Sequence, residues 1–215
     1  SGALGKVVDL SPGLCHAYTT AFLNAVVPKA TTIVLGHDLR PSSPAIAAAC
    51  AAAIQSLGMQ VVYGGALPTP ALALYAAQLG APAIVVTGSH IPADRNGLKF
   101  YIPTGEITKA DEAAILAALD APTSPPGGRG ALHQDTAAGA AYVARYVDFW
   151  GTEALSTTNV ALYGHHGVGL DTLHTVLRAL GATVLPMEPL SAATQKPPGS
   201  TLRSDTTLTR GWAAV

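Results

Sequence analysis

The order of short apolar runs and longer Ala-rich runs is the feature that most constrains the fold. Three short apolar runs, at 31–36, 59–63 and 83–87, are bounded by turn residues and predict buried strands. Ala-rich stretches at 45–54 and 69–79 separate these runs and predict helices. Because parallel strands need long crossover connections, this βαβ order predicts neighbouring parallel strands with helices on both faces.

Proline and glycine mark where the predicted helices begin and end. Ser43 is a candidate N-cap, Pro44 suits a first turn, and Gly58 lies where a left-handed C-cap belongs. A further helix at about 14–27 precedes the first of the three strands. We therefore expect a three-layer α/β/α domain with a mixed, mostly parallel sheet.

A change in composition predicts a domain boundary. The stretch 120–135 has no apolar periodicity and is rich in proline and glycine, so we interpret it as a linker. We therefore expect a first domain at 1–135 and a second one at 136–215.

The second region predicts an incomplete α/β domain. Helices are expected at about 137–150 and 168–180, and strands at 159–163 and 182–186. Two strands do not suffice for an independently stable sheet covered on both faces.

Composition narrows the class of partner. Only 12% of residues are charged, with Lys+Arg 12 against Asp+Glu 13, so no basic field exists for a nucleic acid or an anionic membrane surface. No apolar stretch approaches the roughly 20 residues of a membrane helix.

Cys15 and Cys50 fall within predicted helices and are expected to be reduced thiols of a cytoplasmic protein, although the sequence leaves a disulfide between them open. We expect a small-molecule partner; oligomeric state is not readable from the sequence.

Function is expected to be concentrated in the stretch from Gly88 to Glu106, which is polar and rich in Gly and Pro. The overlapping segment TGSHIPADRNGLKFY at 87–101 predicts a rigid, exposed, polar loop. Ligands of open α/β sheets bind beyond the carboxyl ends of the strands, and this stretch follows the third predicted strand. A serine hydroxyl needs a base, a metal or prior modification to react. His90, Arg95 and Lys99 would accommodate the charge of about −1.5 to −2 that a phosphoserine carries.

Two parts of this loop carry a family resemblance. TGSHIP at 87–92, followed by NGLK at 96–99, resembles the active-site serine loop of the α-D-phosphohexomutases, the family of phosphomannomutases and phosphoglucomutases. In that family T-(A/G)-S-H-x-P leads into N-G-x-K. Further segments resemble the family in its order: SGALG at 1–5, GHDLRPSS at 36–43, PTP at 68–70 and GVG at 167–169.

The resemblance implies an activity. Phosphate would move reversibly between the 1 and 6 positions of a hexose, from phosphorylated Ser89 to the sugar and back, with a hexose 1,6-bisphosphate as intermediate and activator. Lys99 would act as general acid/base. His90 would orient the phosphoserine or help in proton transfer.

The resemblance also implies contacts to ligands. Arg40, Asn96 and Gly97 would bind the hexose phosphate substrate. A Mg²⁺ ion would be bound through the phosphoryl oxygen on Ser89, where it would offset charge on the transferring group.

The sequence departs from the family in several places. The D-G-D-x-D-R loop that supplies three aspartates to the metal does not occur, the sugar-reading and distal phosphate-binding segments have no counterpart, and Leu4 stands where the family has arginine. We therefore expect this chain alone to have little mutase activity and to be part of a longer protein. The alternative is a non-catalytic remnant that binds a partner or a sugar phosphate. A serine hydrolase is disfavoured because no G-x-S-x-G elbow occurs, and the choice among mannose, glucose and amino sugars stays open.

Other polar and aromatic features are interpreted structurally. Thr108 to Asp111 resembles a helix capping box. The adjacent pair at 165–166 is not expected to bind a metal, because adjacent histidines usually diverge. Trp150 and Trp212 are expected to anchor cores.

Overall fold

The computed structural model describes residues 2–119, 128–164 and 167–187. The remaining positions, which include Ser1, the histidine pair at 165–166 and Trp212, lie outside the described residues.

A single seven-stranded sheet organises the first domain, with the spatial order β1-β5-β4-β2-β3-β7 and β6 paired to β5. The parallel part consists of β2 (Thr32–His37), β3 (Gln60–Ala66), β4 (Ala83–Val86) and β7 (Leu132–Gln134). The antiparallel part consists of β1 (Ala3–Lys6), β5 (Arg95–Ile102) and β6 (Gly105–Glu106). The expected mixed, mostly parallel sheet is confirmed.

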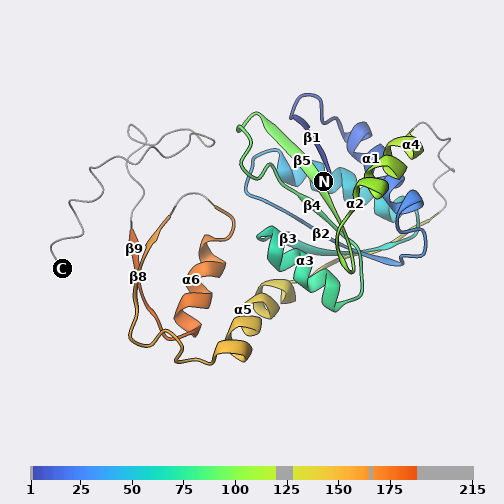
Figure 1. Ribbon diagram of the computed structural model, residues 1–215. Helices are drawn as coiled ribbons and strands as arrows, with labels where there is room; N and C mark the ends of the chain where they lie inside the picture. Colours follow the sequence, from blue (N-terminus) through green and yellow to red (C-terminus); the bar gives the residue numbers. More distant parts are fainter. Residues whose placement is uncertain (1, 120–127, 165–166, 188–215) are drawn as a thin grey trace.

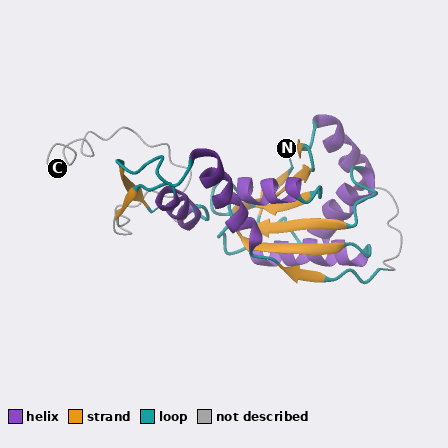
Figure 2. Cartoon of the chain, turned by 90° about the horizontal axis from the view of Figure 1, so that it is seen from below, coloured by secondary structure: helices purple, strands orange, loops and turns teal. Residues whose placement is uncertain are grey.

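Helices cover both faces of this sheet (Figure 2). One face packs against α1 (Pro12–Ala25), α2 (Ser43–Ser56) and α4 (Lys109–Leu119), and the opposite face against α3 (Thr69–Gln78). The larger core centres on Phe22 and Phe100, whose stacked rings have centroids 4.7 Å apart. Both side chains are buried, so this pair joins α1 directly to β5.

The cysteines lie in the same core as reduced thiols. Cys15 and Cys50 are both buried and free, as expected. Burial raises the pKa of both thiols, that of Cys50 to about 12. No helix among the described residues is long and apolar enough to cross a membrane.

The structure corrects several expected elements. Residues 95–102, expected to be part of a polar loop, form β5 in the interior of the sheet. The polar residues in RNGLKFY obscure the alternating pattern of a strand, in which Asn96, Leu98 and Phe100 are buried. The stretch interpreted as a linker contains β7, a short exposed strand without an alternating pattern.

Two expected helix starts have different outcomes. Ser43 is the first residue of α2 rather than its N-cap, and its hydroxyl donates to the Asp38 carboxylate instead of accepting from a helix N–H. The capping box is confirmed: the Asp111 carboxylate accepts from the Thr108 N–H at 2.8 Å, and the Thr108 hydroxyl accepts from the Asp111 N–H at 3.3 Å.

The region after β7 forms a smaller α/β unit (Figure 1). It consists of α5 (Ala137–Trp150), α6 (Leu170–Ala179) and the parallel strands β8 (Asn159–Tyr163) and β9 (Thr183–Met187). α5 packs against both α3 and α6. Trp150 is 63% exposed, so the expectation that it anchors a core is wrong. The placement of a domain boundary near residue 135 stays a prediction.

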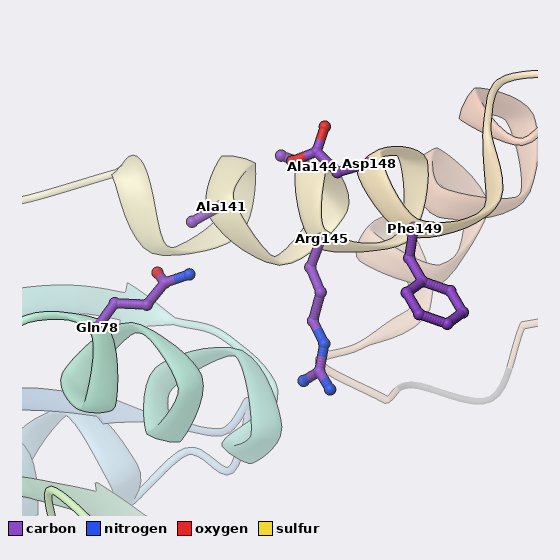
Figure 3. A pocket seen from close by; sticks show the side chains of 6 residues that line it. All are labelled: Gln78, Ala141, Ala144, Arg145, Asp148 and Phe149. Carbon is purple, nitrogen blue, oxygen red and sulfur yellow. The ribbon is translucent and has the colours of Figure 1, made fainter.

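A hollow of about 510 Å³ lies between the end of α3 and α5 (Figure 3), lined by Gln78, Ala141, Ala144, Arg145, Asp148 and Phe149. Arg145 and Phe149 point to one side of α5, whereas Asp148 lies on the other. None of these residues belongs to the 87–101 segment, so this hollow is separate from the serine loop.

The Phe22–Phe100 contact gives a test of the core. Phe22→Ala removes one ring of a buried stack and should lower the free energy of unfolding by about 3–5 kcal/mol, measured by denaturant titration. Phe149→Ala is the control, because Phe149 is 76% exposed and its removal should leave stability nearly unchanged. Equal losses for the two variants would contradict this account of the core.

Candidate active site

The site lies where the strand order of the sheet reverses. From β2 the chain passes through α2 to β3 on one side, then returns through α3 to β4 on the other side of β2. α2 follows β2 on one face of the sheet, whereas α3 leads into β4 from the opposite face. The carboxyl ends of β2 and β4 therefore lie at a topological switch point, where open α/β sheets bind ligands. The serine loop, residues 87–94, connects β4 to β5 at this point.

The carboxylate of Asp38 joins the two segments. Its Oδ1 accepts hydrogen bonds from the Arg40 N–H at 3.0 Å and the Ser43 hydroxyl at 2.5 Å. Its Oδ2 accepts from the Thr87 hydroxyl at 2.9 Å and the Gly88 N–H at 3.0 Å. Asp38 therefore fastens the start of α2 to the end of β4.

These hydrogen bonds keep Asp38 ionised. Partial burial raises the pKa of its carboxyl, but the hydrogen bond from Ser43 and those from Arg40, Gly88 and Thr87 together outweigh burial. The pKa of Asp38 is therefore held below its usual value, and the group is a carboxylate at neutral pH.

Arg40 supports the serine loop from behind. Only 15% of its side chain is exposed, and Nε lies 3.4 Å from Asp38 Oδ2. The two terminal nitrogens donate to loop carbonyl oxygens at 2.6–3.4 Å, Nη1 to those of Pro92 and Arg95 and Nη2 to those of Ser89 and Ile91. All N–H groups of the guanidinium fork thus have partners within the protein.

The guanidinium requires a glycine beside it. A Cβ atom on Gly88 would lie 2.2 Å from Arg40 Nε, so a side chain at this position would displace the arginine. Ser89 follows with φ at 49°, a left-handed conformation that costs a non-glycine residue about 1–2 kcal/mol. Its N–H donates to the Thr87 hydroxyl at 3.0 Å. The surrounding hydrogen bonds hold Ser89 in this conformation while its side chain stays exposed.

Asn96 forms another connection between α2 and the sheet. The side chain is fully buried; Nδ2 donates to the hydroxyls of Ser42 at 2.8 Å and Ser43 at 2.9 Å, and Oδ1 accepts from the Gly97 N–H at 2.8 Å. Gly97 packs beneath Leu4, whose Cδ2 would lie 2.3 Å from a Cβ atom there.

The structure thus separates the predicted site residues into two groups. Ser89 and His90 are exposed on the loop, and Lys99 is half-buried on β5 opposite Val85. No hydrogen bond or ion pair joins Lys99 to the loop within the part of the chain that the structure describes. Arg40 and Asn96 lie behind the loop, where their polar groups bind the protein itself instead of facing a ligand.

Sequence reasoning missed the central position of Asp38. It gave Ser43 only the role of a candidate N-cap. The signal that could have identified them is the combination of an aspartate and two serines directly after a buried strand, in the GHDLRPSS segment. Such short polar side chains can accept or donate to a neighbouring strand end.

The residues present do not form a complete metal site. Within the described ranges, no group of three or more His, Cys, Asp or Glu side chains is placed to hold a metal ion. Both oxygens of Asp38 already accept hydrogen bonds from the protein. The described residues therefore do not fit Mg²⁺ by themselves.

Comparisons with known proteins give consistent matches. The family model described as "Phosphoglucomutase/phosphomannomutase, alpha/beta/alpha domain I" matches residues 1–125. A phosphomannomutase of Salmonella muenchen is 45% identical over 190 residues, which cover 86% of this chain and 39% of that protein. A phosphomannomutase of Sinorhizobium fredii is 42% identical over 218 residues, covering 91% and 46%. A phosphoglucosamine mutase of Symbiobacterium thermophilum is 34% identical over 187 residues, covering 82% and 41%.

Solved structures show the same fold. A phosphoglucomutase/phosphomannomutase family protein of Burkholderia thailandensis superposes with a TM-score of 0.73 at 25% identity, covering 86% of this chain and 42% of that one. A chain from Thermus thermophilus gives 0.74 at 26% identity, covering 87% and 44%. The chain spans less than half the length of these relatives.

Replacing Arg40 by lysine tests its role behind the loop. A lysine ammonium keeps the charge but cannot direct a planar fork at four carbonyl oxygens, so Arg40→Lys should lower the free energy of unfolding by about 1–3 kcal/mol. Limited proteolysis should cut within 88–94 sooner than in the unaltered protein. Arg145→Lys, on the exposed side of α5, is the control and should change neither result. A normally protected loop in Arg40→Lys would contradict the assigned role.

The lowered pKa of Asp38 predicts a pH dependence. A carboxyl with a depressed pKa in the folded state stabilises that state above its unfolded pKa of about 3.9, and this stabilisation is lost as pH falls through the folded value. Asp38→Asn should therefore be less stable than the unaltered protein by a constant amount between about pH 5 and 8. The difference should shrink below about pH 4, measured by denaturant titration across pH. A difference that does not depend on pH would refute the assignment.

Proposed function

Because the chain belongs to the phosphoglucomutase/phosphomannomutase family, we propose that it performs the phosphoserine step of a hexose phosphate mutase, an isomerase, with Ser89 as the phosphoryl carrier. The observation that supports this most is the exposed Ser89 side chain at a strand carboxyl end, in a loop whose backbone is fixed by Arg40. A transferring group needs this combination of access and fixed position, since phosphoryl transfer relies on positioning and electrostatics.

The proposed transfer conserves atoms and charge. The bond between phosphorus and Ser89 Oγ breaks while a bond forms between phosphorus and a hydroxyl oxygen of the hexose phosphate. The proton of that hydroxyl passes to Lys99, which acts as general base, and Lys99 then gives a proton to Ser89 Oγ as general acid. The products are a hexose 1,6-bisphosphate and a free serine, and the reverse step with the other phosphate completes the isomerisation.

The remaining residues take distinct proposed roles. His90, exposed next to Ser89, orients the phosphoryl group. Arg40 and Asn96 act as positioning residues and not as substrate contacts, because their donors are used within the protein. Gly97 contributes by leaving room for Leu4 on the sheet.

The activity of the whole protein extends beyond these residues. The family implies Mg²⁺, but the described residues supply no ligand set for it, so no step above is assigned to the ion. We propose that turnover on a hexose phosphate requires parts present in the longer relatives, which this chain covers to less than half. The buried free thiols of Cys15 and Cys50 support a cytoplasmic location.

A non-catalytic role is the alternative, favoured by the incomplete metal ligand set. Such a protein would bind a sugar phosphate or a protein partner without forming phosphoserine. Chemical modification of Ser89 therefore separates the two proposals.

Intact mass measures that modification. After incubation with glucose 1,6-bisphosphate and Mg²⁺, the protein should gain the mass of one phosphoryl group, and peptide fragmentation should locate it on Ser89. Ser89→Ala should gain none, whereas the control Ser156→Ala, at an exposed position in the second unit, should behave like the unaltered protein. An unchanged mass, or a phosphoryl group on another residue, would overturn the mutase proposal.

A further inference from the structure

Two cations lie directly opposite each other where the serine loop enters the sheet. β1 pairs antiparallel with β5, and the register places Lys6 against Arg95, the first residue of β5. Side chains of such opposed residues point to the same face, with Cβ atoms about 4.5–5.5 Å apart. Like charges in this arrangement repel, so the pair disfavours the folded state unless an anion is bound.

The protein does not neutralise this pair. Lys6 and Arg95 are both exposed, and neither has a carboxylate within ion-pair distance among the residues that the structure describes. The nearest acids in sequence are Asp9 and Asp94, and the Asp94 contact to β1 is made by its backbone oxygen, which accepts from the Val7 N–H at 2.8 Å. Lys+Arg number 12 against 13 Asp+Glu in the whole chain, so a general excess of positive charge does not explain the pair.

The pair continues into the proposed active site. Alternation along β5 places Arg95, Gly97 and Lys99 on one face. Gly97 lies between the other two residues and is covered by Leu4 of β1. Glu106 is opposite Tyr101, at the far end of β5 from the loop. Positive charge is therefore concentrated at the end of the strand that adjoins Ser89.

The backbone of Arg95 is fixed while its side chain is available. Its carbonyl oxygen accepts from Arg40 Nη1 at 3.1 Å, and its N–H donates to the Pro92 oxygen at 3.1 Å. Its guanidinium makes no hydrogen bond within the described part of the chain. A rigidly placed arginine fork beside a lysine ammonium is an arrangement suited to a phosphate group, which accepts bidentate hydrogen bonds from arginine.

We propose that Lys6 and Arg95 form a binding subsite for a dianionic phosphate monoester beside the Ser89 loop. The choice of phosphate over other anions rests on the proposed function. The phosphate could belong to a bound hexose phosphate or to phosphorylated Ser89. Lys6 lies on β1 two residues after Leu4. It therefore supplies positive charge near a position whose own side chain is apolar.

Affinity for a free sugar phosphate tests the first source. Calorimetric titration with glucose 6-phosphate is carried out on Ser89→Ala, which cannot be phosphorylated at this position, and on Ser89→Ala combined with Lys6→Ala or Arg95→Ala. Each added substitution should weaken binding about tenfold, since each removes a charge-assisted hydrogen bond to the phosphate. Lys29→Ala, which removes an exposed lysine between α1 and β2, is the matched control and should leave the affinity unchanged.

Thermal stability distinguishes a binding role from a structural one. Without phosphate, Lys6→Ala should melt at the same or a higher temperature than the unaltered protein, because it relieves the repulsion with Arg95. With glucose 6-phosphate, it should lose most of the rise in melting temperature that ligand binding produces. If phosphorylated Ser89 is the occupant, phosphorylation should raise the melting temperature of the unaltered protein but not that of the Lys6→Ala, Arg95→Ala double variant.

The outcomes separate this inference from the proposed function. The inference is overturned if neither the glucose 6-phosphate affinity nor the effect of phosphorylation responds to Lys6 and Arg95 more than to Lys29. Formation of phosphoserine together with that result would leave the mutase proposal intact. Binding that depends on the pair, in a protein whose Ser89 is never phosphorylated, would support the subsite and overturn the mutase proposal.

Discussion

The carboxylate of Asp38 is the interaction on which the site depends, because it joins the segment after β2 to the segment after β4. β2 and β4 are neighbours in the sheet, yet the chain reaches them by helices on opposite faces. A backbone hydrogen bond from the Asp38 N–H to the Val86 oxygen, at 2.9 Å, ends the pairing of the two strands, and beyond it side-chain bonds join the segments that follow. Asp38 supplies those bonds to Ser43 on one side and to Thr87 and Gly88 on the other.

Arg40 extends this connection to the chemistry. Its backbone N–H is fixed by Asp38, and its guanidinium collects the carbonyl oxygens of the loop that carries Ser89. Four carbonyl groups, those of Ser89, Ile91, Pro92 and Arg95, accept from this one cation. Ser89 has a left-handed conformation at the start of the loop. The cost of that conformation is offset by charge-assisted hydrogen bonds that a neutral side chain could not make. Arg40 thus fixes the backbone of the loop through its carbonyl oxygens, and the side chain of Ser89 stays exposed.

Local sequence patterns predicted the parallel strands β2, β3 and β4 and the helices α1 to α3, because apolar runs between proline and glycine have few other solutions. They did not predict β5 as a strand. Its polar letters serve different surroundings: Asn96 is buried against the serines at the start of α2, and Gly97 lies under Leu4 of the edge strand. Such partners are distant in the sequence, so no local period reveals them. The motif in the loop predicts its functional residues, and that assignment stays a prediction. The motif could not show that the polar groups of Arg40 and Asn96 bind the protein itself, because their partners are distant in the sequence.

The sequence by itself determined the βαβ order and the position of Ser89 directly after a strand, since each depends on neighbours within a few residues. Tertiary structure alone decided which polar groups face outward. Arg40 is about fifty residues from the loop that it holds, and Lys6 meets Arg95 only because β1 pairs with β5 in one register. Each polar side chain has a fixed number of N–H or O–H groups to donate. The fold determines whether these groups bind within the protein or remain available to a ligand.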